Sequence, residues 1–173
     1  SFMDRPADQF PVCHEGESLA ERQDLAPTAP QPMRNKFSSL IPALAQPVAP
    51  DCLSIINDPS RTFLGQAQKE RFKQDIAASD ATWKVVVNER PMQEFYAYSY
   101  DRWEGFAPER KEIIDFLRNN VRNTVFLTTD MHANLYNEVK LDTLKPESTV
   151  NSGIYEFVTG PVAARRWASP PRP

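Results

Sequence analysis

The alternation of hydrophobic and polar positions becomes regular only after residue 60. Residues 66–78 place Ala, Phe and Ile on one side of a helix and charged residues on the other, which predicts an amphipathic helix. Residues 82–87 and 124–129 are rich in β-branched residues, and each segment predicts a buried strand. A second helix is predicted from Ala107 to Asn120, with Pro108 in its first turn. Residues 135–141 and 153–159 predict two more strands, as antiparallel neighbours.

This succession of helices and strands predicts an α/β layer protein. In such sheets, ligands bind beyond the carboxyl ends of the strands. The chain contains no internal repeat, P-loop, GxSxG or CxxC motif. We therefore expect its chemistry at the carboxyl ends of the two buried strands.

The first 60 residues have a different character. They hold nine of the 16 prolines, and proline removes a backbone donor and fixes φ. Residues 1–60 are therefore predicted to be an extended, looping segment without a long helix or a central strand. Residues 61–164 form the predicted domain, and residues 165–173 are predicted to be a flexible tail.

The two cysteines, Cys13 and Cys52, bracket most of the proline-rich segment. A disulfide between them would restrict the unfolded chain by about 3–4 kcal/mol in the entropic account and would suit an exported protein. The alternative is two unrelated reduced thiols. The first residues lack the pattern of a signal peptide and do not resemble a native start, so we expect a fragment or a processed product.

Composition excludes some functions. The chain is 40% hydrophobic and 25% charged, and no apolar run approaches the roughly 18 residues needed to span a bilayer. Its net charge of −3 does not indicate an electrostatic nucleic-acid binder.

Candidate chemistry lies at Asp130 and His132, where the strand predicted at residues 124–129 ends. Residues i and i+2 of a strand point to the same side, so these two side chains are expected to converge. A carboxylate oxygen and an imidazole nitrogen can then form two corners of a metal site. The alternative is an acid and a histidine in a surface turn, hydrogen-bonded to the backbone.

Five segments occur in an order that resembles a known family. They are residues 63–68 (FLGQAQ), 83–88 (WKVVVN), 101–110 (DRWEGFAPER), 125–133 (VFLTTDMHA) and 156–161 (EFVTGP). Together they resemble the C-terminal half of PhoD-type alkaline phosphatases, secreted relatives of the calcineurin-like metallophosphoesterases. The resemblance covers about residues 61–164, and residues 1–60 resemble nothing we can place.

The resemblance implies part of a four-layer α/β/β/α sandwich in an exported protein, secreted, periplasmic or cell-surface. It also implies hydrolysis of phosphate mono- or diesters by a metal-activated water, with calcium and iron as the expected metals. Asp130 and His132 match the position and spacing of paired metal ligands in the superfamily. The partner it implies is an N-terminal half, or a companion chain, that completes the site.

Three further residues are candidates for substrate binding: Asn88, Asn134 and Arg102. Glu89 and Arg90, which follow Asn88, are lesser candidates for the site. Thr129 departs from the family, which usually has Gly before the acid, and we expect its side chain to crowd a close backbone approach. The chain also lacks the ligands of the N-terminal half. Two alternatives therefore stay open: a catalytically inactive metallophosphatase-like scaffold, or a binding module that uses the aromatic residues of 95–106.

Overall fold

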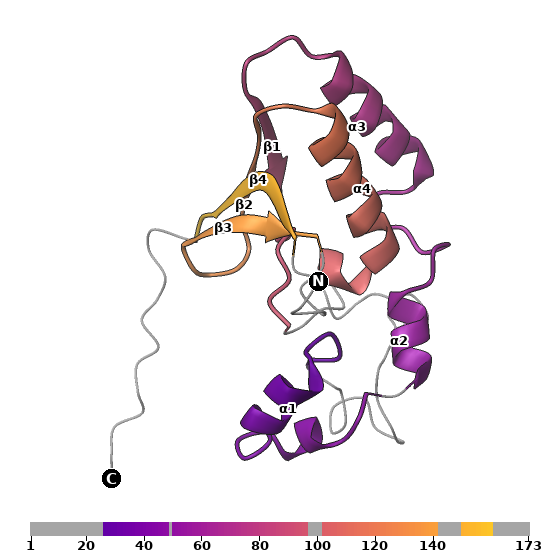
Figure 1. Ribbon diagram of the computed structural model, residues 1–173, viewed down its shortest axis with the longest axis vertical. Helices are drawn as coiled ribbons and strands as arrows, with labels where there is room; N and C mark the ends of the chain where they lie inside the picture. Colours follow the sequence, from indigo (N-terminus) through magenta and orange to yellow (C-terminus); the bar gives the residue numbers. More distant parts are fainter. Residues whose placement is uncertain (1–25, 49, 97–101, 142–149, 161–173) are drawn as a thin grey trace.

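The computed structural model describes residues 26–48, 50–96, 102–141 and 150–160. The chain folds into α-helices, 3-10 helices (η) and one mixed β-sheet (Figure 1). Along the chain the elements are α1 (Gln31–Phe37), η3 (Pro42–Ala45), α2 (Pro50–Ile56), α3 (Gln66–Ala78), β1 (Lys84–Asn88), η5 (Trp103–Gly105), α4 (Ala107–Asn120), β2 (Thr124–Thr128), β3 (Leu135–Lys140) and β4 (Asn151–Val158).

The sheet has the strand order β1-β2-β4-β3. Strands β1, β2 and β4 are parallel, and β3 pairs with β4 in the antiparallel direction. Asn88 is paired with Thr128, so the carboxyl ends of β1 and β2 lie side by side. The predicted strands are confirmed with small shifts of their ends, and so are the two helices at residues 66–78 and 107–120.

Helices α3 and α4 cover one face of the sheet (Figure 1). Ile113, Ile114 and Leu117 of α4 are buried against Phe126 of β2 and Ile154 of β4. The apolar positions of α4 recur every three or four residues, which places them on one side of the helix. The hydrophobic core therefore lies between the helices and this face.

The opposite face of the sheet is open in the described part of the chain. One row of neighbours across all four strands consists of Val87, Leu127, Phe157 and Tyr136. All four side chains are exposed, from 40% for Leu127 to 80% for Val87. The prediction of buried strands was therefore wrong for one face of the sheet, because the helices of the described residues cover only the other face.

The proline-rich segment is more ordered than its sequence predicted. Within residues 26–60 it forms α1, η3 and α2, and neither α-helix is longer than seven residues. The prolines explain both observations. Pro42 and Pro50 begin their helices and Pro32 lies in the first turn of α1, where the missing N–H would have no helical partner. Further prolines then limit helix length.

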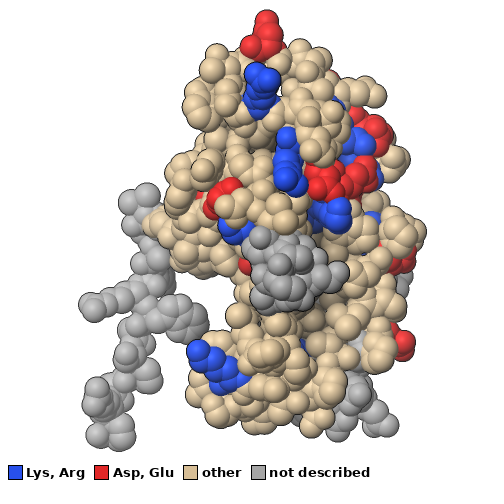
Figure 2. Space-filling model, viewed as in Figure 1, with Lys and Arg blue, Asp and Glu red and all other residues tan. Residues whose placement is uncertain are grey.

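Charged side chains gather over α3 and α4. Figure 2 shows acidic and basic groups next to one another there, where Lys73 of α3 contacts both Glu70 and Glu112 at 2.8 Å. This surface is solvated and mixed in sign, which is typical of the outer face of a covering helix. In the described residues, no helix has the length and apolarity that crossing a membrane requires.

Candidate functional site

Asp130 and His132 lie beyond the end of β2, in a bend that joins β2 to β3. Both have left-handed backbones, with φ of 64° and 52°, a conformation in which Asp, Asn and His are enriched among non-glycine residues. Both residues are exposed. The expectation that strand alternation aligns their side chains was wrong, because strand geometry ends at Thr128. Their position at the carboxyl end of a parallel strand is as predicted.

Arg90 contacts the carboxylate of Asp130. A guanidinium nitrogen of Arg90 donates to Oδ2 of Asp130, and the two residues form an ion pair. From the sequence, Arg90 was only a lesser candidate than Asn88, although a signal for it was present. Arg90 and Asp130 each follow a strand by two residues, and the strand ends Asn88 and Thr128 are paired.

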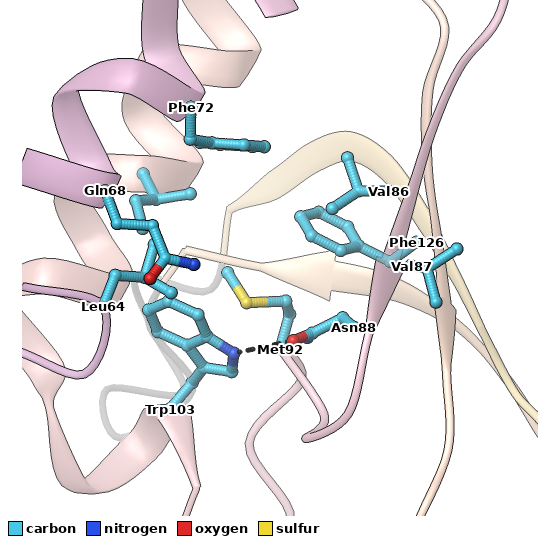
Figure 3. Close-up of a pocket in the computed structure, with 10 residues that line it drawn as sticks. Leu64, Gln68, Phe72, Val86, Val87, Asn88, Met92, Trp103 and Phe126 are labelled. Carbon is cyan, nitrogen blue, oxygen red and sulfur yellow. Dashed lines mark hydrogen bonds between the residues drawn. The ribbon is translucent and has the colours of Figure 1, made fainter.

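Asn88 points to the helix side of the sheet, toward Trp103 (Figure 3). Its Oδ1 accepts from the Trp103 indole N–H at 3.4 Å, and its Nδ2 donates to the carbonyl of Arg90. Asn88 also lines a cavity of about 130 Å³ between α3 and β1. The other lining residues are mostly apolar: Leu64, Gln68, Phe72, Val86, Val87, Met92, Trp103, Ile113 and Phe126. These contacts give Asn88 a structural role and leave its predicted substrate contact untested.

Asn134 directly precedes β3, and Gly160 lies just after β4, so the two residues meet at one end of this antiparallel pair, beside the bend. The backbone N–H of Gly160 donates to Oδ1 of Asn134 at 2.8 Å. A Cβ on Gly160 would lie 2.9 Å from the backbone N of Ala133, so the close backbone approach falls at Gly160. Thr129, where we expected crowding, is exposed. A substrate role for Asn134 stays a prediction.

Arg102 lies half-buried directly before η5. Its charge opposes the burial that raises the pKa of the Glu104 carboxyl. Glu104 itself accepts from the backbone N–H groups of Phe95 and Tyr96 and from the Thr28 hydroxyl, at 2.7, 3.3 and 3.3 Å. This places Arg102 beside a buried clamp on the loop that follows β1. The structure does not test a substrate contact for Arg102.

The donor set fits only part of a metal site. A carboxylate and an imidazole are suitable ligands for divalent and trivalent cations. Within the described residues, however, no group of three or more His, Cys, Asp or Glu side chains could hold a metal. Structural and catalytic metals take from about four to eight ligands. A metal bound by Asp130 and His132 would therefore need further donors.

The predicted disulfide lies partly outside the described residues, because these do not include Cys13. Cys52 lies in α2, where it is 2% exposed and packs with Ile56, Val48 and Ala107. Its buried position ties α2 to the start of α4. The pairing of Cys13 with Cys52 stays a prediction.

Three comparisons with known proteins agree. A family model described as PhoD-like phosphatase matches residues 33–171. The chain is 30% identical over 105 residues to alkaline phosphatase D of Bacillus subtilis (strain 168), a match that covers 54% of this chain and 17% of that protein. The solved structure of PhoD matches with a TM-score of 0.53 and 26% identity, covering 62% of this chain and 22% of that one. The chain thus spans less than a quarter of either relative.

Proposed function

Because the chain belongs to the PhoD-like phosphatase family, we propose that it supplies the C-terminal part of a metal-dependent phosphoesterase site. Asp130 and His132 are the proposed metal ligands, and a phosphate mono- or diester is the proposed substrate. The observation that carries the proposal is the place of this pair at the carboxyl end of a parallel strand, within the matched residues. Mixed α/β architecture and the match to PhoD support it.

The residues of this chain have distinct parts in the proposed site. Asp130 and His132 would each give one ligand atom, and a carboxylate favours a hard cation such as calcium, with iron as the second expected metal. A metal held there supplies Lewis acidity and an activated water for attack on phosphorus. Arg90 pairs with Asp130 and would fix the orientation of that carboxylate.

The remaining ligands would come from an N-terminal half or a companion chain. Two features support this part of the proposal: the donor set of the described residues is incomplete, and one face of the sheet is open. Export of the protein and a Cys13–Cys52 disulfide belong to the same proposal, since disulfides persist in oxidising compartments.

A second function is favoured by the same incomplete donor set. If no companion exists, the chain is an inactive metallophosphatase-like scaffold, or a binding module, that retains the fold without its chemistry. The two functions differ in one respect that can be measured: only the first requires a metal bound through His132.

The test is to measure the intact mass and the metal content of the protein as purified from its source. We expect a larger assembly that carries metal, with the metal lost in His132→Ala and retained in His14→Ala, which changes the other histidine of the chain. A free 19.7 kDa chain without metal would favour the inactive scaffold. The intact mass of the chain also shows whether the Cys13–Cys52 disulfide is present, because a bridged chain is lighter by two hydrogens.

A further inference from the structure

Glu156 is a fully buried carboxylate in the middle of the sheet. It lies in β4, beside Phe126 of β2, and its exposed fraction is 0%. A buried carboxylate destabilises a fold unless hydrogen-bond donors surround it. Glu156 also belongs to one of the five segments that resemble the family, yet the proposed function gives it no part. The donors around it indicate what that part is.

Three donors from two separate elements meet at this carboxylate. Oε1 accepts from the backbone N–H of Met92 at 2.8 Å and from the hydroxyl of Thr128 at 2.7 Å. Oε2 accepts from the backbone N–H of Gln93 at 3.0 Å. Met92 and Gln93 lie in the loop after β1, whereas Thr128 is the last residue of β2. One side chain of β4 therefore joins the loop to the neighbouring strand end.

The joined elements carry the two charges of the candidate site. Arg90 lies two residues before Met92, and Asp130 lies two residues after Thr128. Arg90 and Asp130 form an ion pair. Two residues of extended chain reach at most about 7 Å. Fixing Met92 and Thr128 therefore also restricts where Arg90 and Asp130 can lie.

Other contacts hold the same loop without reaching β2. Nε of Arg110 donates to the carbonyl of Met92 at 2.6 Å, and the backbone N–H of Lys140 donates to Oε1 of Gln93 at 2.9 Å. These bonds attach the loop to α4 and β3. Glu156 differs from them because it also holds the strand end that leads to Asp130.

The same arrangement occurs at a second place in the chain, between α4 and the segment before α3. Glu109 of α4 is 3% exposed and accepts from the hydroxyl of Thr62 at 2.7 Å and from the consecutive backbone N–H groups of Phe63 and Leu64. Glu156 and Glu109 thus each bind one threonine hydroxyl and two consecutive N–H groups. Glu109 is therefore a matched control with equal chemistry and a different location.

We propose that Glu156 is a positioning residue of the candidate site, which holds Arg90 opposite Asp130 by fixing the loop after β1 to the end of β2. This inference rests on the proposed function for its purpose, but its geometry concerns only residues of this chain. Glu156 touches neither Asp130 nor Arg90 in the contacts described, so it acts through Met92, Gln93 and Thr128.

The test compares Glu156→Gln with Glu109→Gln by NMR of the full chain. An amide has one acceptor oxygen, so in either orientation the NH₂ group of the new side chain would face the backbone N–H of Met92 or of Gln93. We expect amide exchange to rise about tenfold beyond any global change at whichever of these two residues loses its acceptor. We also expect the Arg90 Nε–Hε resonance to shift. Glu109→Gln should speed exchange at Phe63 and Leu64 and shift the Arg90 resonance less than Glu156→Gln does, because it reaches Arg90 only through Phe63, Trp103 and Asn88.

A milder variant guards against loss of the fold. Thr128→Val removes a single donor to Glu156 and keeps the shape of the strand residue. It should shift Arg90 and speed exchange at Met92 in the same direction, by a smaller amount. The proposal is overturned if neither variant moves the Arg90 resonance, or if Glu109→Gln moves it as much as Glu156→Gln does.

A separate titration distinguishes failure of this proposal from failure of the proposed function. Mn²⁺ alone, added to the protein as purified from its source with any companion chain present, should broaden the amide resonances of Asp130 and His132 if they form part of a metal site. Absence of broadening would count against the metal site, while the Arg90 resonance would still decide the role of Glu156.

Discussion

The two faces of the sheet carry similar side chains but have different surroundings. On the face toward the helices, Phe126 and Ile154 are each 3% exposed. On the opposite face, Phe157 is 42% and Val87 80% exposed. Strands β2 and β4 contribute apolar side chains to both faces, so the difference lies in what covers each face.

This difference shows that the strands are suited to two covering layers, of which the described residues supply one. Parallel strands with apolar residues on both sides normally lie between two layers. Rows of exposed aromatic and branched side chains on a sheet mark a surface that another element covers. The match to alkaline phosphatase D covers only 17% of that protein, which leaves ample chain for a second layer in a complete relative.

The largest expected effect comes from removing a phenylalanine side chain from each face of the sheet and comparing the two losses of stability. Phe126→Ala should lower the free energy of unfolding by about 3–5 kcal/mol, because it leaves a cavity beneath α4. Phe157→Ala should lower it by only about 1 kcal/mol, since Phe157 loses a contact with Tyr136 worth about that much. Urea denaturation of both variants measures the difference. Equal losses would mean that the open face is covered in solution.

An effect of intermediate size is the pH dependence of stability that arises from the buried Glu104. Burial raises the pKa of Glu104 from 4.5 to about 7, with Glu94 adding to the rise, while the N–H groups of Phe95 and Tyr96 and the charge of Arg102 oppose it. The folded state keeps this proton to higher pH than the unfolded state does. Stability should therefore fall by about 3 kcal/mol as pH rises from about 4.5 to about 7.

The control for this pH dependence is Glu104→Gln, which cannot ionise. Its free energy of unfolding, followed by urea denaturation between pH 4.5 and 8, should lack the fall that the unmodified chain shows. Glu89, on the loop after β1, is exposed, and Glu89→Gln should keep the fall. A pH profile that Glu104→Gln leaves unchanged would place the titrating group elsewhere.

Sequence patterns predicted the secondary structure after residue 60 well because hydrophobic periodicity dominates there. Helix α3 has the bounds expected from its pattern, and β2 ends one residue early. Periodicity was less informative for residues 26–60, where helix formation depends on where each proline falls within a helical turn.

The candidate site was predicted in position but not in geometry. Asp130 and His132 were identified from the end of a strand, whereas their left-handed backbones depend on the bend toward β3 and could not be inferred from alternation. The pairing of Arg90 with Asp130 and the part of Glu156 were missed because the partners are distant in sequence. Glu156 contacts residues 28 and 64 positions away, and only the strand order brings these together.

The smallest expected effect on stability is the sharpest test of the comparison, because adjacent residues of β1 face opposite sides. Val87→Lys should change the free energy of unfolding by about 0.5 kcal/mol, as at other exposed positions. Val86→Lys should cost several times more, since Val86 packs against the core and a buried charge is unfavourable. Sedimentation velocity should show less self-association for Val87→Lys than for the unmodified chain, because the lysine interrupts an apolar face at a sheet edge. If both lysines cost the same, the faces do not differ in solution, and the case for a missing layer fails.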